Sequence, residues 1–229
     1  MQGEAEKPST LVVAVDGPAG AGKSTVARLV ASRLGLLYLD TGAMYRALAL
    51  RALATRTDVA DAVRLVDLLQ KADIHVAEDP NRQLRVWLDG QDVTDAIRRP
   101  EVHATVAQVA SVPGVRAGMV ERQRALAELG GVVMDGRDIG TYVLPDAPFK
   151  FFLTASLEAR AARRHRELAA RGFPVDVRVL QQEIVDRDRM DSTRAVGPLE
   201  CAPDAHAIDT TDLSVTQVVD QILAVVRGR

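Results

Sequence analysis

A short, strongly apolar run near the start of the chain ends directly in a glycine-rich segment. Residues 11–15 (LVVAV) are too few and too rich in β-branched side chains for a helix, and they predict a buried strand of a parallel sheet. Residues 24–34 then carry apolar side chains at helical spacing, and Gly35 is placed to end that helix. A strand that passes through a tight loop into a helix is typical of α/β proteins.

The loop between these two elements reads GPAGAGKS and fits the pattern GxxxxGK[ST] at every position. Glycines let main-chain N–H groups turn inward around polyphosphate oxygens, and the helix that follows adds the positive end of its dipole. Lys23 would supply a cation to the β- and γ-phosphates of a nucleoside triphosphate, and Ser24 a hydroxyl ligand for Mg²⁺. The residues expected to hold the triphosphate are Gly17, Pro18, Ala19, Gly20, Ala21, Gly22, Lys23, Ser24 and Thr25.

The rest of the chain alternates strand and helix patterns, with one interruption. Alternation of period two at residues 74–76 and 84–88, followed by Asp89-Gly90, predicts a small antiparallel sheet with a type I′ hairpin. Other strands are expected at residues 36–39, 132–134, 149–153 and 205–208. Helical patterns run over residues 41–69, 100–129, most of 156–194 and 214–226. These patterns predict an α/β domain of three layers around a five-stranded parallel sheet.

Composition and charge limit the class of protein. The 229 residues are 47% hydrophobic and 26% charged, and the net charge of −2 argues against a protein that binds nucleic acid polymers. No apolar run is long enough to cross a bilayer, and residues 1–10 are polar with no apolar h-region, so we do not expect secretion. A single cysteine, Cys201, excludes an internal disulfide and a cysteine-based zinc cluster. We therefore expect a cytoplasmic protein that contacts neither membranes nor nucleic acid polymers.

Polar residues follow two of the predicted strands, as DTGAMYR from Asp40 and DGRDIG from Asp135. Ligands of open α/β sheets sit beyond the carboxyl ends of the strands, so both segments should face the glycine-rich loop. Thr41 can be explained fully by a structural role, as the N-cap of the helix that follows. Arg46, by contrast, would oppose the helix dipole in the first turn, and a phosphate partner would explain it. Asp135 is placed to hold a water molecule bound to Mg²⁺.

Two arginine-containing segments leave a purely structural alternative open. Arg137 and Asp138 could form only a salt-bridged turn at the surface. The Arg-rich stretch 156–194, with Arg160 and Arg164 on one helix face, could be a solvated helix pair or a lid that closes over a nucleotide. We expect Tyr45, Trp87 and the aromatic group at 149–152 to pack in the protein rather than to serve as stacking platforms for a base. No ligand role is expected for the four histidines, His75, His103, His165 and His206, or for Cys201.

Taken together, these segments resemble the bacterial cytidylate kinases, a family of nucleoside-monophosphate kinases. The similarity runs from about Leu11 to the C-terminus and also includes RMDSTRAVGPL at Arg189–Leu199. It implies a phosphate-loop kinase fold in a single domain over residues 1–229, with an inserted CMP-binding subdomain at about 71–105 and a helical lid at about 156–194. It further implies a monomer that uses Mg²⁺ and transfers the γ-phosphate of ATP to CMP or dCMP, with UMP a poorer acceptor.

The resemblance also implies roles for individual residues. Arg46, Arg137 and Arg194 would grip the acceptor phosphate, and Arg187 and Asp191 would contact the sugar. Cytosine carries an amine donor beside ring acceptors, so Asp138 would accept from the amine and Arg116 would donate to the ring, with Thr41 also reading the base. The remaining assignments are Tyr45 in the CMP site, Arg160 at the adenine side of the lid, Arg164 at its phosphate side, a catalytic set of Lys23, Arg46, Arg137, Arg164 and Arg194, and Mg²⁺ at Ser24 and, through water, Asp135.

One departure and two other functions remain open at this point. Ala107 stands where relatives can carry a serine that contacts the sugar, which leaves the preference between CMP and dCMP undetermined. A phosphate-loop kinase for another monophosphate or a sugar fits the same loop, as does a nucleotide-sensing protein that binds ATP without transfer. The guanine-type motif NKxD is absent from the sequence, which argues against a GTPase switch.

Overall fold

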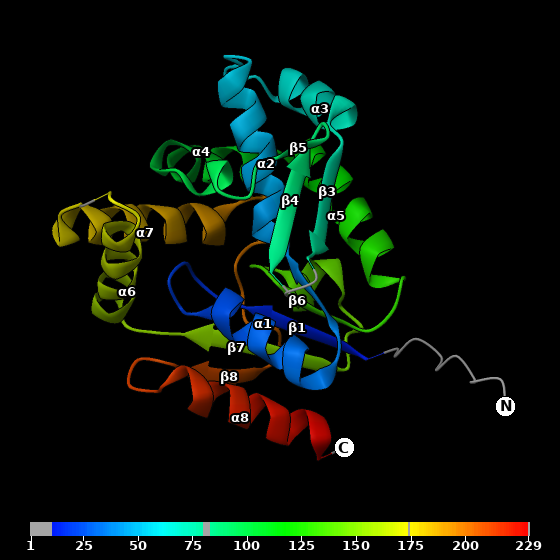
Figure 1. Ribbon diagram of the computed structural model, residues 1–229, viewed down its shortest axis with the longest axis vertical. Coiled ribbons are helices and arrows are strands. Elements are labelled where there is room, and N and C mark those ends of the chain that lie inside the picture. The colour runs from blue at the N-terminus through cyan, green and yellow to red at the C-terminus, as the bar shows by residue number, and fades with distance from the viewer. Residues whose placement is uncertain (1–10, 80–82, 174, 229) are drawn as a thin grey trace, which may run out of the picture.

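The computed structural model describes residues 11–79, 83–173 and 175–228, and within them five parallel strands form one sheet (Figure 1). The order across the sheet is β2-β6-β1-β7-β8. Their bounds are β1 Val12–Asp16, β2 Leu37–Asp40, β6 Val132–Asp135, β7 Phe149–Thr154 and β8 His206–Asp209. The expected strand–loop–helix unit is confirmed, because helix α1 (Lys23–Leu34) follows β1 and ends at Gly35, whose φ is 68°.

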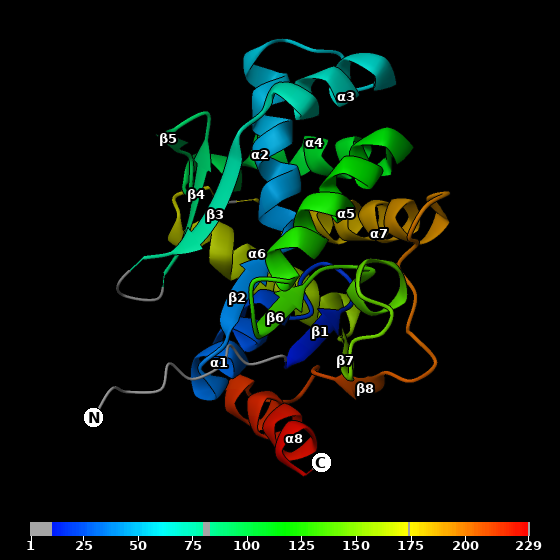
Figure 2. The same ribbon diagram turned by 90° about the vertical axis from the view of Figure 1, so that its right-hand side faces the viewer.

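The central strand β1 is apolar because helices cover both sides of the sheet. Val13, Ala14 and Val15 are fully buried. Helices α1 and α8 (Val215–Arg227) lie on one side, and α2 (Thr41–Ala54) and α5 (Pro113–Ala127) lie on the other (Figure 2). The register pairs Val15 with Asp135 and Asp40 with Asp135. The carboxyl ends of β1, β2 and β6 therefore meet at one edge of the sheet, where each strand ends in an aspartate.

The predicted antiparallel insert is also present. It consists of β3 (Ile74–Glu78), β4 (Leu84–Leu88) and β5 (Gln91–Asp92). The type I′ hairpin is confirmed, since Asp89 and Gly90 both have positive φ values, of 51° and 78°. A 3₁₀ turn (Ala96–Arg98) and helix α4 (Pro100–Ser111) follow, so the subdomain that we expect at about 71–105 contains this sheet and the start of α4.

Two helical patterns are each divided into a pair of helices. The pattern from Thr41 to about Leu69 forms α2 and α3 (Ala62–Lys71), with Arg56 at a φ of 52° in the turn between them. The pattern from Pro100 to Leu129 forms α4 and α5, which separate at Val112. Pro113 supplies no N–H to continue α4 and holds Val112 in extended backbone, with a ψ of 117°.

The Arg-rich stretch forms two helices, α6 (Leu157–Ala170) and α7 (Val177–Thr193), which pack against each other at the side of the molecule (Figure 1). Gly172 lies between them with a φ of 80°. At the other end of the chain, α8 begins with the capping box that its sequence predicts, formed by Ser214 and Gln217. No helix in the described ranges combines the length and the apolar character needed to cross a bilayer.

Candidate active site

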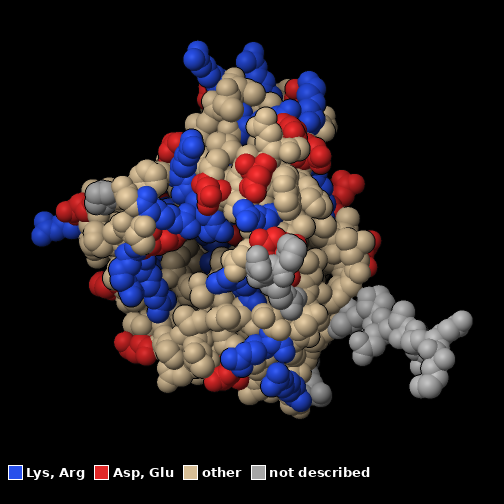
Figure 3. Space-filling view, in the orientation of Figure 1, with Lys and Arg blue, Asp and Glu red and all other residues tan. Residues whose placement is uncertain are grey.

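A cleft of about 1560 Å³ opens at the edge of the sheet where β1, β2 and β6 end. Its walls come from the glycine-rich loop, α2, α4, α6, α7 and the loop at residues 136–140, which follows β6. Lys and Arg side chains gather around a hollow between the α6–α7 pair and the rest of the molecule (Figure 3). The segments that were expected to face the glycine-rich loop therefore line one cleft with it.

The glycine-rich loop turns so tightly that two of its positions require glycine, because a side chain would not fit there. Gly17 has a φ of 140°, and a Cβ there would collide with the carbonyl oxygen of Leu153. Gly20 has a φ of 79° and lies against Arg160, the first arginine of the predicted lid. Lys23 is buried and donates from Nζ to the carbonyl oxygen of Pro18 at 2.7 Å. Burial, and next Arg137, lowers the pKa of Lys23 well below its usual value, which favours an anionic partner for its ammonium group.

Beside this loop, Ser24 and Asp135 form a pair of hard oxygen donors. Ser24 Oγ donates to Asp135 Oδ2 at 2.9 Å, and Tyr38 OH donates to Asp135 Oδ1 at 2.8 Å. Burial, and then Asp40, raises the pKa of Asp135 to about 6, so a cation beside this carboxylate would be stabilised. Among the described residues there is no group of three or more His, Cys, Asp and Glu that could enclose a metal. A hydroxyl, one carboxylate and substrate phosphates suit Mg²⁺, which usually keeps several waters.

The start of α2 corrects one expectation about Thr41. Asp40 is the N-cap residue, because its Oδ1 accepts the N–H of Ala43 at 2.9 Å. Thr41 is instead buried, and its hydroxyl donates to the carbonyl oxygen of Asp135 at 2.8 Å, which ties α2 to the end of β6.

Arg46 lies in the second turn of α2 rather than in the first, and its partner here is a carboxylate. Its Nη2 donates to Asp40 Oδ2 at 2.7 Å. Burial acts to raise the pKa of Asp40, but the charge and hydrogen bond of Arg46, together with Arg98 and the N–H of Ala43, outweigh burial and lower it. The Arg46 guanidinium is thus held at the wall of the cleft by an ionised neighbour.

The expected base-reading residues Arg116 and Asp138 are paired with each other. The Arg116 side chain is only 1% exposed and donates to Asp138 Oδ2, while Arg194 Nη2 donates to Asp138 Oδ1 at 3.0 Å. The Arg116 guanidinium also lies over the ring of Tyr45, at 5.8 Å from its centroid. Asp138 is buried among charged partners from other elements, so the alternative of a turn paired only at the surface is wrong.

A second carboxylate, Asp191 on α7, gathers three guanidinium groups. Arg137 Nε donates to Asp191 Oδ2 at 2.8 Å, and Arg194 and Arg187 approach it at 3.7 and 3.9 Å. Burial, and next Arg137, lowers the pKa of Arg187 to about 10. Among the described residues, the ion pairs of Arg116, Arg137, Arg187 and Arg194 are with Asp138 and Asp191, so within this group four positive charges face two negative ones. Such an excess in a buried site favours binding of an anion.

The α6–α7 pair contacts the glycine-rich loop directly. Arg160 Nη1 donates to Asp188 Oδ2 at 2.6 Å and to the carbonyl oxygen of Ala19 at 3.3 Å. Arg163, for which no role was expected from the sequence, donates to the hydroxyl of Thr210 at 2.9 Å and lines the same cleft. Arg164 lines the cleft as well, although its ion pair at 2.8 Å is with Glu167 on its own helix. Arg160 is buried, so the alternative of a fully solvated helix pair does not describe this face.

His103 on α4 lines the cleft, although no feature of the sequence pointed to it. Its Nε2 is buried and has no hydrogen-bond partner among the described residues. Burial, and then the charge of Arg164, lowers the pKa of His103 to about 2, with Arg46, Arg171 and Arg187 adding to the effect. A lone histidine in a helix carries no spacing signal, and only the folded chain surrounds it with guanidinium groups.

We expect His103 to stay uncharged through the physiological range. Because the unfolded imidazole takes up a proton near pH 6.5 and the folded one does not, His103 should lower the stability of the fold as the pH falls below about 6.5. The C2–H signal of His103 in NMR spectra of the nucleotide-free protein should therefore not move between about pH 8 and pH 5. A midpoint within that interval would contradict the assignment of a buried neutral imidazole.

The other residues considered from the sequence mostly pack against neighbouring side chains. Ala107 lines the cleft and offers only a methyl group there. Phe149 and Phe151 are buried in the core, which confirms that they pack. His75 lies against Trp87, His206 against Phe151, and His165 Nδ1 lies 2.9 Å from the carbonyl oxygen of Val175. Cys201 is exposed and carries a free thiol.

Comparisons with known proteins show the family to which this chain belongs. The family model described as cytidylate kinase matches residues 13–228. A cytidylate kinase of Pelotomaculum thermopropionicum is 56% identical over 212 residues, covering 93% of this chain and 94% of that protein. One of Geobacillus kaustophilus is 56% identical over 217 residues, covering 95% and 96%. An uncharacterized protein from Eubacterium ventriosum shares the fold at a TM-score of 0.52 and 14% identity, covering 96% of this chain and 100% of its own. The chain belongs to the cytidylate kinase family.

Proposed function

We propose that this chain transfers the γ-phosphate of ATP to CMP or dCMP, giving ADP and CDP or dCDP. Membership of the cytidylate kinase family supports the reaction, since relatives that match nearly the whole chain carry that name. The observation that carries the proposal is that one cleft contains both a phosphate-binding loop and a second basic group, which consists of Arg116, Arg137, Arg187 and Arg194. A kinase with two nucleotide substrates needs both, whereas a nucleotide sensor needs only the first.

The second basic group fits a nucleoside monophosphate in charge and in polarity. Its excess of two positive charges matches the charge of a phosphate monoester dianion. Arg46, Arg137 and Arg194 are assigned to the acceptor phosphate, and Arg187 and Asp191 to the sugar. Asp138 accepts from the cytosine amine, and Arg116 donates to the ring acceptors, with Thr41 and Tyr45 completing the base site. Ala107 offers no hydroxyl to the sugar, so both CMP and dCMP are accepted.

The glycine-rich loop, residues Gly17–Thr25, holds the phosphates of ATP, with Arg160 at the adenine side and Arg164 at the phosphate side. Ser24 and, through water, Asp135 would hold Mg²⁺, which when bound neutralises charge on the phosphate oxygens. The α6–α7 pair acts as the lid, at about residues 156–194, and residues 71–105 form the CMP-binding subdomain. Shielding the γ-phosphate from water prevents its loss by hydrolysis.

The chemistry then requires positioning and charge stabilisation. An acceptor phosphate oxygen forms a bond to the γ-phosphorus as the bond to the bridging oxygen of ADP breaks in line with it. This oxygen is already ionised at neutral pH, so no general base is needed. Lys23, Arg137 and Arg164 stabilise charge on the oxygens of the transferring group. We further propose that the enzyme is a monomer that acts in the cytoplasm on these small molecules.

The direct test measures ADP release with ATP and Mg²⁺ while the acceptor is varied among CMP, dCMP, UMP, AMP, GMP and dTMP. We expect kcat/KM to be highest for CMP and dCMP, lower for UMP, and lower by at least about 10²-fold for the purines, whose bulk and edges do not match Asp138 and Arg116. A preference for AMP, GMP or dTMP would overturn the assignment. ATP binding without acceptor-dependent ADP release would identify a nucleotide-sensing protein instead.

A further inference from the structure

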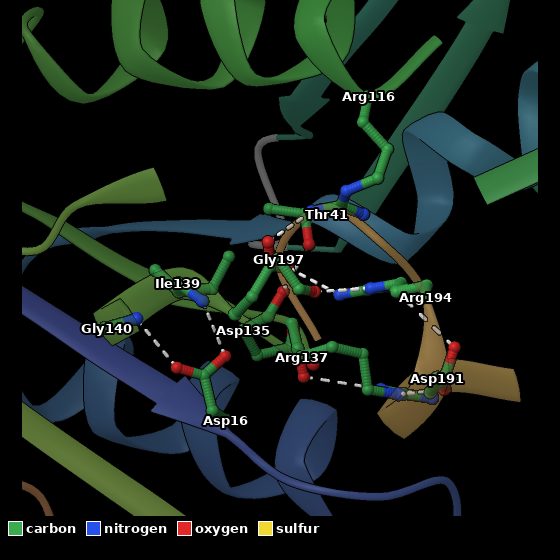
Figure 4. A network of polar contacts seen from close by, with 12 residues as sticks. Asp16, Thr41, Arg116, Asp135, Arg137, Ile139, Gly140, Asp191, Arg194 and Gly197 are labelled. Carbon is green, nitrogen blue, oxygen red and sulfur yellow. Dashed lines mark hydrogen bonds and ion pairs between the residues drawn. The ribbon is translucent and has the colours of Figure 1, made fainter. Parts of the chain in front are cut away.

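Asp16, the last residue of β1, makes a contact that the reaction above leaves unexplained. Its side chain is buried, and the residue is only 4% exposed. Oδ1 accepts the main-chain N–H of Ile139 at 2.8 Å, and Oδ2 accepts that of Gly140 at 2.7 Å (Figure 4). One carboxylate therefore spans from the strand that leads into the glycine-rich loop to a segment more than 120 residues later in the chain.

The two N–H groups begin a π-helical turn, Ile139–Val143. The first N–H groups of a helical turn have no partner inside the turn, and a side chain from the preceding residue normally satisfies one of them. That preceding residue is Asp138, and it makes no such capping bond. Its carboxylate faces Arg116 and Arg194 instead. Asp16, at the end of β1, accepts the N–H groups at the start of this turn. The carboxylate of Asp138 is therefore not needed as a cap and faces the cleft.

Keeping the Asp16 carboxylate charged in a buried position has an energetic cost. Burial raises the pKa of Asp16 to about 6, and the N–H groups of Gly140 and Ile139 offset only part of that effect. Lys23 also stabilises the charge, whereas Asp138 opposes it. A neutral residue at the end of β1 would avoid this cost, but it could not form charge-assisted hydrogen bonds with both N–H groups.

We propose that Asp16 is a positioning residue that fixes the 136–140 loop relative to the glycine-rich loop. The main chain of Asp16 leads into Gly17, and its side chain holds the turn that orients Arg137 and Asp138. One residue thereby sets the distance between the groups assigned to the acceptor and those assigned to ATP. The inference rests on the proposed function, because it names how the acceptor side of that site is held in place.

The test replaces Asp16 with asparagine, which keeps the size of the side chain. Its amide oxygen can accept only one of the two N–H groups, and its NH₂ group faces the other. Loss of a charge-assisted hydrogen bond predicts a rise in KM for CMP of about tenfold to hundredfold, with little change in KM for ATP. Asp61→Asn is a matched control, because Asp61 also accepts a main-chain N–H, that of Arg64 at 3.0 Å, but lies exposed at the start of α3.

An unchanged KM for CMP, or an equal rise in both KM values, would overturn the proposal, since a loss of general stability affects both nucleotides. Hydrogen exchange of the wild-type protein without nucleotides provides a second test that does not depend on the variant folding. The main-chain amides of Ile139 and Gly140 should exchange much more slowly than the main-chain amide of Arg137. Among the described residues, the Arg137 main-chain N–H has no acceptor. Equal exchange would remove the contact on which the inference rests. This result is independent of whether CMP is the acceptor.

Discussion

Replacing Lys23 with alanine is expected to lower kcat by about 10³-fold or more while the protein remains folded. The ammonium group of Lys23 lies in the glycine-rich loop, and no side chain of similar charge on that loop could replace it. Its contribution should be greatest when charge develops on the transferring phosphoryl group, so the effect should fall mainly on kcat. Steady-state ADP release at saturating ATP and CMP measures it directly.

Stability should behave differently from activity in the same variant. Burial lowers the pKa of Lys23, which means that the folded protein holds the charged form at a cost. Removing the ammonium group should therefore leave the melting temperature unchanged or raise it. Lys71→Ala provides the control, because Lys71 is exposed and, within the part of the chain that the structure describes, forms its ion pair with Asp67 on its own helix. Turnover of Lys23→Ala close to that of the wild type would refute the role of this residue.

Replacing Asp138 with asparagine is expected to lower kcat/KM for CMP by about 10²- to 10³-fold. The amide keeps the shape of the side chain, but its NH₂ group meets the exocyclic amine of cytosine as donor against donor. Uracil presents an acceptor at the same position, so UMP should lose much less. The ratio of kcat/KM for CMP to that for UMP should therefore fall by about tenfold or more.

The loss in this variant should be confined to the acceptor, with KM for ATP little changed. Asp138 also holds Arg116 and Arg194, so the melting temperature should fall because two buried guanidinium groups lose a charged partner. Asp204→Asn removes an exposed carboxylate paired with Lys150 and serves as the control for the loss of an ion pair. An unchanged CMP-to-UMP ratio, or equal effects on ATP and CMP, would count against base recognition by Asp138.

Much of the fold could be predicted because its signals lie between neighbours in the sequence. The glycine-rich loop is a contiguous motif between a strand and a helix, and the Asp89-Gly90 hairpin needs only two residues with positive φ. The points at which the two long helical patterns divide into separate helices could not be predicted in this way. Apolar periodicity continues through the turn near Arg56, so hydrophobic spacing alone does not locate the end of α2.

The site shows the opposite balance. Thr41 fits an N-cap by sequence, yet Asp40 takes that place and the Thr41 hydroxyl bonds to the end of β6. Arg116 and Asp138 were expected near the same base, but their direct pairing follows from the packing of α5 against the 136–140 loop. His103 had no signal at all. Each of these outcomes depends on side chains that come from distant parts of the chain.

The sequence by itself determined the α/β class, the triphosphate loop and, through its resemblance, the family. These depend on periodicity and on contiguous motifs, which are properties of adjacent residues. Only the tertiary structure decided which charges meet, as when Asp16 accepts two N–H groups and Asp191 gathers three guanidinium groups. Electrostatic energy depends on distance through space and on burial, and both are set by how strands and helices pack rather than by their order along the chain.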